Sequence, residues 1–479
     1  MQKEDVCAQS DPGATLAAQC HTLVVKENHD DSNSRDLTLR ILRLPSIQES
    51  QKAPIFFIAG GPGQASGDLL ERFRHQFPQL RIHHDFIFVD QRGTGKSEAL
   101  ECDIDLMPHL DKDAAALEQL NIEASKACLN EYTADLRYYA TPFAVKDLEQ
   151  VRKHFGYDKV NLWGGSYGTR VVLEYLRRFP NSIAASVMDG LAPIQIQLPT
   201  YAERDATQSL NSLLQNCETQ KACQSAFPQL TQRWKTHLQL RKKSPVTQQL
   251  QHPRTQKPVN VYIDDQVLSS WIHLILYSRE LSPILPLAID LATKENYSQL
   301  FSIFALGRED MPTMISEGMQ ATVLCAEDYV FHKENHDKHT QNNTLEDSDL
   351  LNLPPRTGFD NICKLLPKSV LDKTYFSSVE SNIPSLFLSG QFDPATPPRW
   401  AESLLPGFNQ AKHIVVPGGH HIVSQNSCIA NIISEFFSKP EDIQALNDTC
   451  VSHIKPTAYF IDASGPDMKA AIENTGVKP

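Results

Sequence analysis

Residues 159–178 read KVNLWGGSYGTRVVLEYLRR, and the predicted fold rests chiefly on this segment. Its first part, Lys159 to Trp163, is the short apolar run of a buried strand, and its last part, Tyr167 to Arg178, is predicted as a helix. The GGSYG segment at residues 164–168 lies between them, and its glycines allow a sharp turn and a close approach of strand and helix. This strand, turn and helix are typical of an elbow that exposes the hydroxyl of Ser166 above a sheet.

The sequence around this stretch alternates predicted strands and helices. An opening antiparallel pair is expected from the alternating apolar residues of 21–26 and 36–44. Short apolar runs that suit buried parallel strands then occur at 54–59, 86–90, 183–188, 385–389 and 413–416. The alternation predicts a doubly wound, mostly parallel α/β sheet.

A long insertion interrupts this alternation. Roughly 170 residues between Pro193 and Lys368 have a mainly helical pattern, which predicts a cap over the sheet. We therefore expect a first part of the core at 1–195, a helical cap at 196–370, and a second part of the core with a carboxyl-terminal extension at 371–479.

Composition excludes several classes of protein. The chain has 479 residues, of which 41% are hydrophobic and 21% charged, as in a folded globular protein. Its formal net charge is -12 and it has no cluster of basic residues, so nucleic acid binding is disfavoured. No apolar run approaches the roughly 20 residues that span a bilayer, and no membrane span is predicted.

Ten cysteines fall into five couples that are adjacent in the sequence. Such couples suit local disulfides and therefore an oxidising compartment, with buried free thiols as the alternative. The couples are Cys7 with Cys20, Cys102 with Cys128, Cys217 with Cys223, Cys325 with Cys363, and Cys428 with Cys450. Residues 1–5 read MQKED, so a secretory signal, if one existed, is expected to be absent from this sequence. We see no Cys/His metal pattern and predict no metal or cofactor.

A serine hydroxyl needs a histidine to take its proton and an acid to orient that histidine. After an elbow serine, these partners follow along the chain in the order Asp, then His. Asp393 follows the strand 385–389, and His420 follows the strand 413–416. Both are predicted at the carboxyl ends of strands, where open α/β sheets bind their ligands. A turn aspartate and a solvated loop histidine are the alternatives, but the agreement in order and position favours Ser166, Asp393 and His420 as a catalytic triad.

Two details of this site are less determined. His421 follows His420 directly, and because two adjacent loop histidines cannot both point at Ser166, we favour His420. An oxyanion formed at Ser166 also needs N–H donors. The backbone of Tyr167 supplies one, and the GGPG turn at residues 60–63 is expected to supply the other, with Gly61 preferred over Gly60.

These motifs resemble the proline iminopeptidase and tripeptidyl aminopeptidase family of α/β-hydrolases. The resemblance rests on GGPG at 60–63, DQRGTG at 90–95, GGSYGTR at 164–170, DPATP at 393–397 and GH at 419–420. The tripeptidyl branch looks closer because it shares early cysteines, the Cys102 position and a late segment containing Cys450. The resemblance implies the α/β-hydrolase fold with a helical cap, and Ser166, Asp393 and His420 as the triad.

The sequence departs from this family at two positions. Ala59 stands where iminopeptidases often have a histidine, and His421 stands where a glycine often follows the catalytic histidine. Both departures weaken an expectation of strict proline specificity.

We expect an exported serine aminopeptidase that releases one to three residues from peptides with free amino termini. Gly60, Glu327 and Asp328 are the expected substrate-binding residues. Glu327 matches an acidic position of the tripeptidyl branch and could hold the substrate ammonium, with Asp328 as the second choice; an ordinary exposed carboxylate is the alternative. A carboxylesterase or lipase with the same triad is the competing enzyme, whereas the intact Ser, Asp and His disfavour a non-catalytic binding module.

Overall fold

The computed structural model describes residues 18–49, 52–102, 104–198, 200–310, 315–329, 350–353 and 357–466. Its centre is an eight-stranded sheet in the order β1-β2-β4-β3-β5-β6-β9-β10. The first two pairings, β1 with β2 and β2 with β4, are antiparallel, and every other pairing is parallel. The strands are β1 (Gln19–Lys26), β2 (Asp36–Leu44), β3 (Ile55–Ile58), β4 (Phe86–Val89), β5 (Val160–Gly165), β6 (Ile183–Asp189), β9 (Ser385–Gly390) and β10 (Ala411–Val416). The predicted doubly wound, mostly parallel sheet is confirmed.

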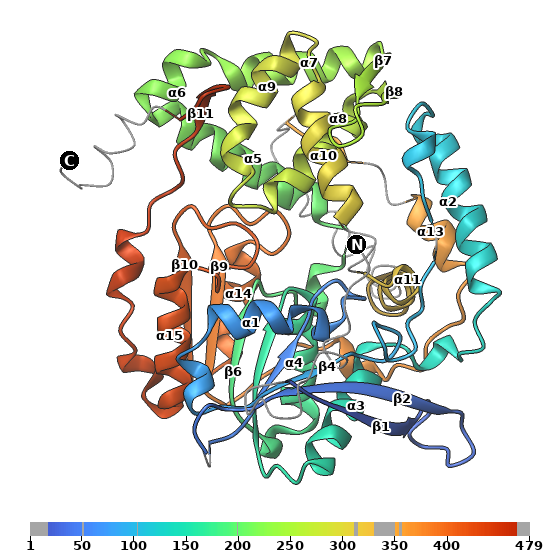
Figure 1. Ribbon diagram of the computed structural model, residues 1–479, viewed down its shortest axis with the longest axis vertical. Coiled ribbons are helices and arrows are strands. Elements are labelled where there is room, and N and C mark those ends of the chain that lie inside the picture. Colours follow the sequence, from blue (N-terminus) through green and yellow to red (C-terminus); the bar gives the residue numbers. More distant parts are fainter. Residues whose placement is uncertain are drawn as a thin grey trace.

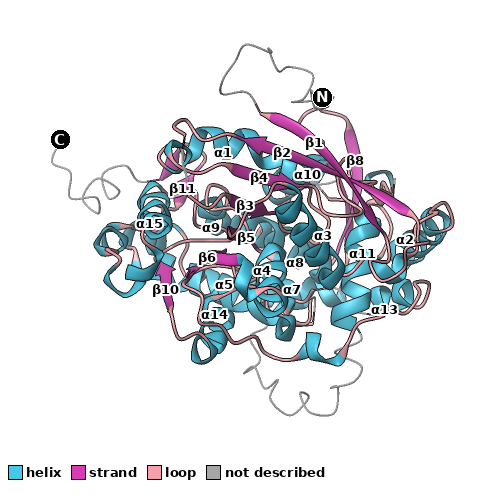
Figure 2. Cartoon of the chain, turned by 90° about the horizontal axis from the view of Figure 1, so that it is seen from below, coloured by secondary structure: helices cyan, strands magenta, loops and turns pink. Residues whose placement is uncertain are grey.

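Helices cover both faces of this sheet, which is why its central strands β3, β4 and β5 are buried along their whole length (Figures 1 and 2). Side chains alternate between the faces. In β3, Phe56 packs with the core cluster that includes α3 (Thr141–His154), α4 (Tyr167–Arg178) and α14 (Pro398–Leu404). Its neighbour Phe57 packs with α1 (Leu70–Gln76) and α15 (Ser427–Ser438).

The insertion after β6 forms a mainly helical layer at the carboxyl ends of the strands, drawn in green and yellow in Figure 1. It has its own buried core, which includes Trp234, Trp271 and Phe301 and also takes in Tyr459 from the carboxyl-terminal segment. Its elements are α5 (Ala202–Thr219), α6 (Lys221–Ala226), α7 (Leu230–Lys243), the hairpin β7 (Val246–Gln251) and β8 (Pro258–Ile263), α8 (Asp265–Leu276), α9 (Leu285–Thr293) and α10 (Ser298–Asp310). We call this layer the cap.

The chain leaves the cap after α10 and returns to the sheet domain. Met319 and Val323 of α11 (Glu317–Leu324) are buried in the same core cluster as α3 and α4. A short π-helix (Cys325–Tyr329) continues α11, and α2 (Ala114–Leu129) and α13 (Thr357–Cys363) lie beside it. The predicted cap boundaries of 196–370 therefore enclose two packing environments, and the division into domains stays a prediction.

Disulfides connect neighbouring segments of this fold. Four predicted couples are bridged: Cys102–Cys128, Cys217–Cys223, Cys325–Cys363 and Cys428–Cys450. Cys20 is also disulfide-bonded, but its predicted partner Cys7 lies outside the described residues. In the described parts of the chain, no helix is both long enough and apolar enough to cross a membrane.

Candidate active site

Ser166 lies in a tight elbow between β5 and α4. Its backbone has φ 54° and ψ -125°, outside the regions that ordinary residues favour. Its N–H donates to the Asp189 carbonyl at 2.8 Å. A Cβ at Gly168 would lie 2.2 Å from the carbonyl oxygen of Ile58, so strand and helix approach this closely only because glycine stands there.

The GGPG turn lies directly against this serine. A Cβ built on Gly60 would be 3.0 Å from Cβ of Ser166, and Gly61 has a φ of +103° that favours glycine. The turn thus lies against the serine at Gly60, and Gly61 is the next residue along the chain. The N–H of Tyr167 belongs to the residue that follows Ser166 as the first of α4.

Asp393 is held in the turn after β9. Its carboxylate accepts the N–H groups of Ala395 and Thr396, both at 2.8 Å, and the hydroxyl of Thr396 at 2.7 Å. The side chain is 1% exposed. Burial alone would raise the pKa of Asp393, but His421 and the bonds from Thr396 outweigh it, and the pKa is lowered. Asp393 is therefore a preorganised carboxylate.

His421, rather than His420, faces this carboxylate. Nδ1 of His421 lies 2.9 and 3.1 Å from the two oxygens of Asp393. His420 instead points into the cap, with Nδ1 2.7 Å from the carbonyl oxygen of Leu276 and Nε2 2.8 Å from Oγ of Ser282. The prediction that Asp393 orients His420 is wrong, because the loop after β10 turns the second histidine of the pair toward the acid.

His421 also lies near the elbow. A Cβ at Gly190 would come within 3.2 Å of Cε1 of His421, and Gly190 follows the residue whose carbonyl binds Ser166. Among the described residues no hydrogen bond joins Ser166 Oγ to His421. Catalytic hydrogen bonds are often long until substrate binds.

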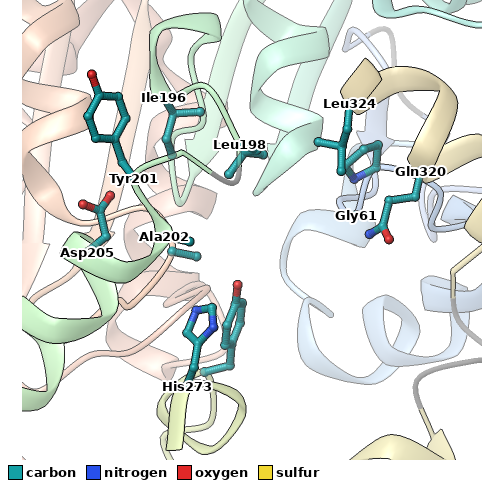
Figure 3. Close-up of a pocket in the computed structure, with 12 residues that line it drawn as sticks. Gly61, Ile196, Leu198, Tyr201, Ala202, Asp205, His273, Gln320 and Leu324 are labelled. Carbon is teal, nitrogen blue, oxygen red and sulfur yellow. The ribbon is translucent and has the colours of Figure 1, made fainter. Parts of the chain in front are cut away.

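A pocket of about 170 Å³ opens beside these groups, between the cap and the sheet domain (Figure 3). Its lining is mostly apolar, with a few polar side chains from α5, α8 and α11. Tyr277 belongs to this lining, and its ring centroid is 5.1 Å from that of His421, so the pocket adjoins the Asp-His pair. The lining residues are Gly61, Pro62, Ile196, Leu198, Tyr201, Ala202, Asp205, His273, Tyr277, Gln320, Leu324 and Ala395.

Glu327 and Asp328, predicted to bind the substrate amine, lie behind the pocket wall and do not line it. Both are 0% exposed. Arg170 is their cationic partner: its guanidinium lies 3.1 Å from Glu327 and binds both oxygens of Asp328, at 2.7 and 3.0 Å. Glu327 further accepts from Tyr375 and from the Thr141 N–H. The expected ammonium anchor is thus corrected to a buried ion pair, since no face of either carboxylate is left for a ligand.

Asp205 is the carboxylate that does line the pocket. The Trp400 indole donates to it at 2.8 Å, and Nε of Arg204 lies 3.0 Å away. Arg399 forms a second ion pair with it. Two guanidinium groups therefore neutralise the charge of this carboxylate.

Two family models match the chain. One, described as the α/β hydrolase fold, matches residues 53–257, and the other, described as TAP-like protein, matches residues 356–450. The first contains the elbow, and the second contains Asp393 and both histidines. The chain has the α/β hydrolase fold.

The curated relatives of this chain are named as hydrolases and peptidases. The Escherichia coli K12 protein YuaR, named as a hydrolase, is 30% identical over 166 residues, which cover 34% of this chain and 33% of YuaR. Serine protease Hip1 of Mycobacterium tuberculosis H37Rv is 26% identical over 213 residues, or 40% of this chain and 41% of the protease. The tripeptidyl aminopeptidase of Streptomyces lividans is 23% identical over 188 residues, or 36% of this chain and 35% of the enzyme. The chain thus matches only 33% to 41% of the length of these relatives.

The first family model is described as a hydrolase fold, and two of these relatives are named as a serine protease and an aminopeptidase. Among solved structures, proline iminopeptidase of Mycobacterium smegmatis is 13% identical, covers 89% of this chain and 100% of its own chain, and has a TM-score of 0.40.

Sequence reasoning missed Asp189, which connects the elbow to the loop that carries His421. Its carboxylate accepts the N–H groups of Val423 at 3.0 Å and Ser424 at 2.8 Å, while its carbonyl accepts from Ser166. Burial raises the pKa of Asp189 although these backbone bonds oppose the shift. An acidic residue at the carboxyl end of a buried strand was the signal in the sequence that could have found it.

In the described parts of the chain, no group of three or more His, Cys, Asp or Glu side chains is arranged to hold a metal ion.

Proposed function

We propose that Ser166, His421 and Asp393 form the catalytic triad and hydrolyse peptide bonds near free amino termini through an acyl-enzyme. The hydrogen bond between His421 and Asp393, beside the strained elbow, carries this proposal. Nδ1–H of His421 donates to the carboxylate, so Nε2 keeps the lone pair that a general base needs.

In the first step Ser166 Oγ attacks the scissile carbonyl carbon, and its proton passes to Nε2 of His421. In this proposal the oxyanion accepts from the backbone N–H groups of Tyr167 and Gly61. The imidazolium then gives its proton to the leaving amine as the C–N bond breaks. Water hydrolyses the ester with His421 again as base, which restores Ser166.

The charge on the imidazolium is stabilised by two buried acids. Burial lowers the pKa of His421, but the carboxylates of Asp393 and Asp189 outweigh this effect and the pKa is raised. A raised pKa holds the proton on His421 until the leaving group accepts it.

Peptide hydrolysis is proposed from the relatives named as a serine protease and a tripeptidyl aminopeptidase. We propose the release of one to three residues, and the pocket between cap and sheet domain adjoins the Asp-His pair through Tyr277. Export is proposed because disulfides such as Cys325–Cys363 form in oxidising compartments.

A carboxylesterase is the second candidate, and one observation favours it. The acids expected to hold an ammonium group, Glu327 and Asp328, already bind Arg170, and Asp205 in the pocket binds two arginines. A neutral ester needs no such anchor.

Chromogenic amides of one, two and three residues, each with a free and an acetylated amino terminus, distinguish the candidates. Aminopeptidase action requires turnover of at least one free-amine amide and its loss on acetylation. Esters cleaved fast while all amides resist would instead establish the esterase. Labelling by a fluorophosphonate in the native protein but not in Ser166→Ala tests the triad on its own, whichever substrate is preferred.

A further inference from the structure

The cap contacts the sheet domain at the residue just before each member of the Asp-His pair. Ser209 of α5 donates from Oγ to the carbonyl of Phe392 at 2.6 Å, next to Asp393. His420, next to His421, bonds to the carbonyl of Leu276 and the hydroxyl of Ser282. The cap thus contacts both loops through Phe392 and His420, the residues that directly precede Asp393 and His421.

The bonds of His420 fit one neutral tautomer of its ring. A carbonyl oxygen only accepts, so Nδ1 carries the hydrogen that is donated to Leu276, and Nε2 accepts from Ser282 in the neutral ring. Leu276 is the last residue of α8, where helix carbonyls lack a partner within the helix. The ring is 5% exposed and packs edge-on against Phe392. Both nitrogens are therefore satisfied, and neither is available as a base.

We propose that His420 is a positioning residue, which clamps the catalytic loop to the cap and so keeps His421 against Asp393. This role rests on the proposed triad. Adjacent Cα atoms are 3.8 Å apart, so a displacement of residue 420 is passed on to His421.

Other contacts hold the same loop from the sheet side. The Phe392 N–H donates to the Gly419 carbonyl at 2.7 Å, and Asp189 binds the N–H groups of Val423 and Ser424. The bonds of His420 therefore add a third support to this loop, between the bond at Gly419 and those at Val423 and Ser424. Its loss should misplace the base without unfolding the loop.

The test compares His420→Ala with His420→Asn. The alanine variant is expected to lower both the rate of fluorophosphonate labelling and kcat for a small acetate ester, each about 10- to 100-fold, because misplacement by about 1 Å costs that much. KM should change little. His420→Asn should recover most of the rate, since its amide N–H can still donate toward the Leu276 carbonyl. Ser282→Ala, which removes the bond at Nε2 and leaves the one to Leu276, should lose a few-fold.

His237→Ala is the matched control. His237 is also 5% exposed and bonds to the Tyr297 hydroxyl at 3.0 Å inside the cap, away from the catalytic loop. This variant should lose stability but keep its labelling rate, measured below both melting transitions.

Three results would overturn the clamp. Equal losses in His237→Ala and His420→Ala would show general destabilisation. Loss of peptide turnover in His420→Ala with unchanged labelling would limit His420 to holding the cap over the substrate. A full loss in His420→Ala together with a mild effect of His421→Ala would instead move the base to His420, and would refute the proposed triad itself.

Discussion

At the scale of single residues, two adjacent histidines have opposite environments. Burial lowers the pKa of His420, whose ring nitrogens meet a carbonyl and a hydroxyl. His421 faces two carboxylates and has a raised pKa. The neutral ring of His420 suits a structural hydrogen bond, whereas the ring of His421, which can become charged, suits proton transfer.

We expect His421→Ala and Ser166→Ala to lower kcat to a similar extent, about 10⁶-fold, because members of a triad act as a unit. The double variant should be no slower than either single variant. Single-turnover kinetics with an activated ester measure all three. If the kcat loss of the double variant equalled the product of the two single losses, the two residues would act independently.

Activity should fall as pH falls through the raised pKa of His421, because only the neutral imidazole accepts the serine proton. The titratable groups facing this ring are Asp393, Asp189, His273 and Tyr277. Burial lowers the pKa of His273 to about 4, so it stays neutral across this range.

In Asp393→Asn the main group that raises the His421 pKa is gone. The acid limb of kcat/KM should therefore move to lower pH, and the plateau should drop by about 10⁴, as in other triads. The pH profile of the two proteins provides the measurement. An unmoved acid limb would show that a different group controls the rate.

Glu327→Gln is now expected to act on stability rather than on amine recognition. The change leaves Arg170 with one of its two carboxylates, and breaking a buried ion pair costs about 3 kcal/mol. Urea unfolding should report this loss, while free-amine and acetylated substrates should lose activity in equal proportion.

Glu123→Gln on the exposed face of α2 is the control, with an expected change below about 0.5 kcal/mol. A selective rise of KM for free-amine substrates in Glu327→Gln would restore the amine anchor.

The sequence could place Ser166 and Asp393 in turns after strands because strand, turn and residue are contiguous in each case, and their catalytic roles stay a proposal. It could not separate His420 from His421, since the choice depends on which side chain meets the Leu276 carbonyl, 144 residues earlier in the chain. The prediction that Glu327 binds the substrate amine was wrong for a related reason, because nothing near Glu327 in the sequence reveals Arg170 as its partner.

At the scale of elements, the elbow depends on β3, β5 and α4 approaching more closely than side chains allow. Gly168→Ala would place a Cβ 2.2 Å from a backbone oxygen of β3, which cannot move as a side chain can. We expect the free energy of unfolding to fall by about 1–3 kcal/mol. Labelling of Ser166 by the fluorophosphonate should also slow.

Gly307→Ala in α10 is the matched control. Its Cβ would meet only the flexible end of Leu274 at 3.3 Å, and alanine favours a helix over glycine by about 1 kcal/mol. This variant should be neutral or slightly more stable in the same unfolding assay. Equal destabilisation by both substitutions would contradict the close approach at the elbow.

Elements were predicted well wherever periodicity and turn residues lie together, as in β5 and α4. The return of α11 to the sheet domain was not predicted, because a buried amphipathic helix shows which face is apolar but not which core covers it. Met319 and Val323 would suit either the cap or the sheet domain.

At the scale of the whole molecule, the site is assembled from distant parts of the chain. Contacts such as Ser209 with Phe392 join residues 183 positions apart. Disulfides limit how far such segments can separate in the unfolded chain. Their sequence separations are 26 for Cys102–Cys128, 6 for Cys217–Cys223, 38 for Cys325–Cys363 and 22 for Cys428–Cys450.

The last prediction ranks these bridges. Closing a longer loop removes more entropy from the unfolded state, by about 4 kcal/mol for the longest of these loops and about 2 kcal/mol for the shortest. Replacing both cysteines of Cys325–Cys363 by serine should therefore lower Tm most, and the same change at Cys217–Cys223 least. Cys325 also begins the π-helix that carries Glu327 and Asp328, so its loss should loosen the ion pair with Arg170 as well. Calorimetry of the paired variants, alongside the reduced native protein, measures the order. If Cys217–Cys223 proved the most stabilising bridge, strain and contacts in the folded state would outweigh chain entropy in this protein.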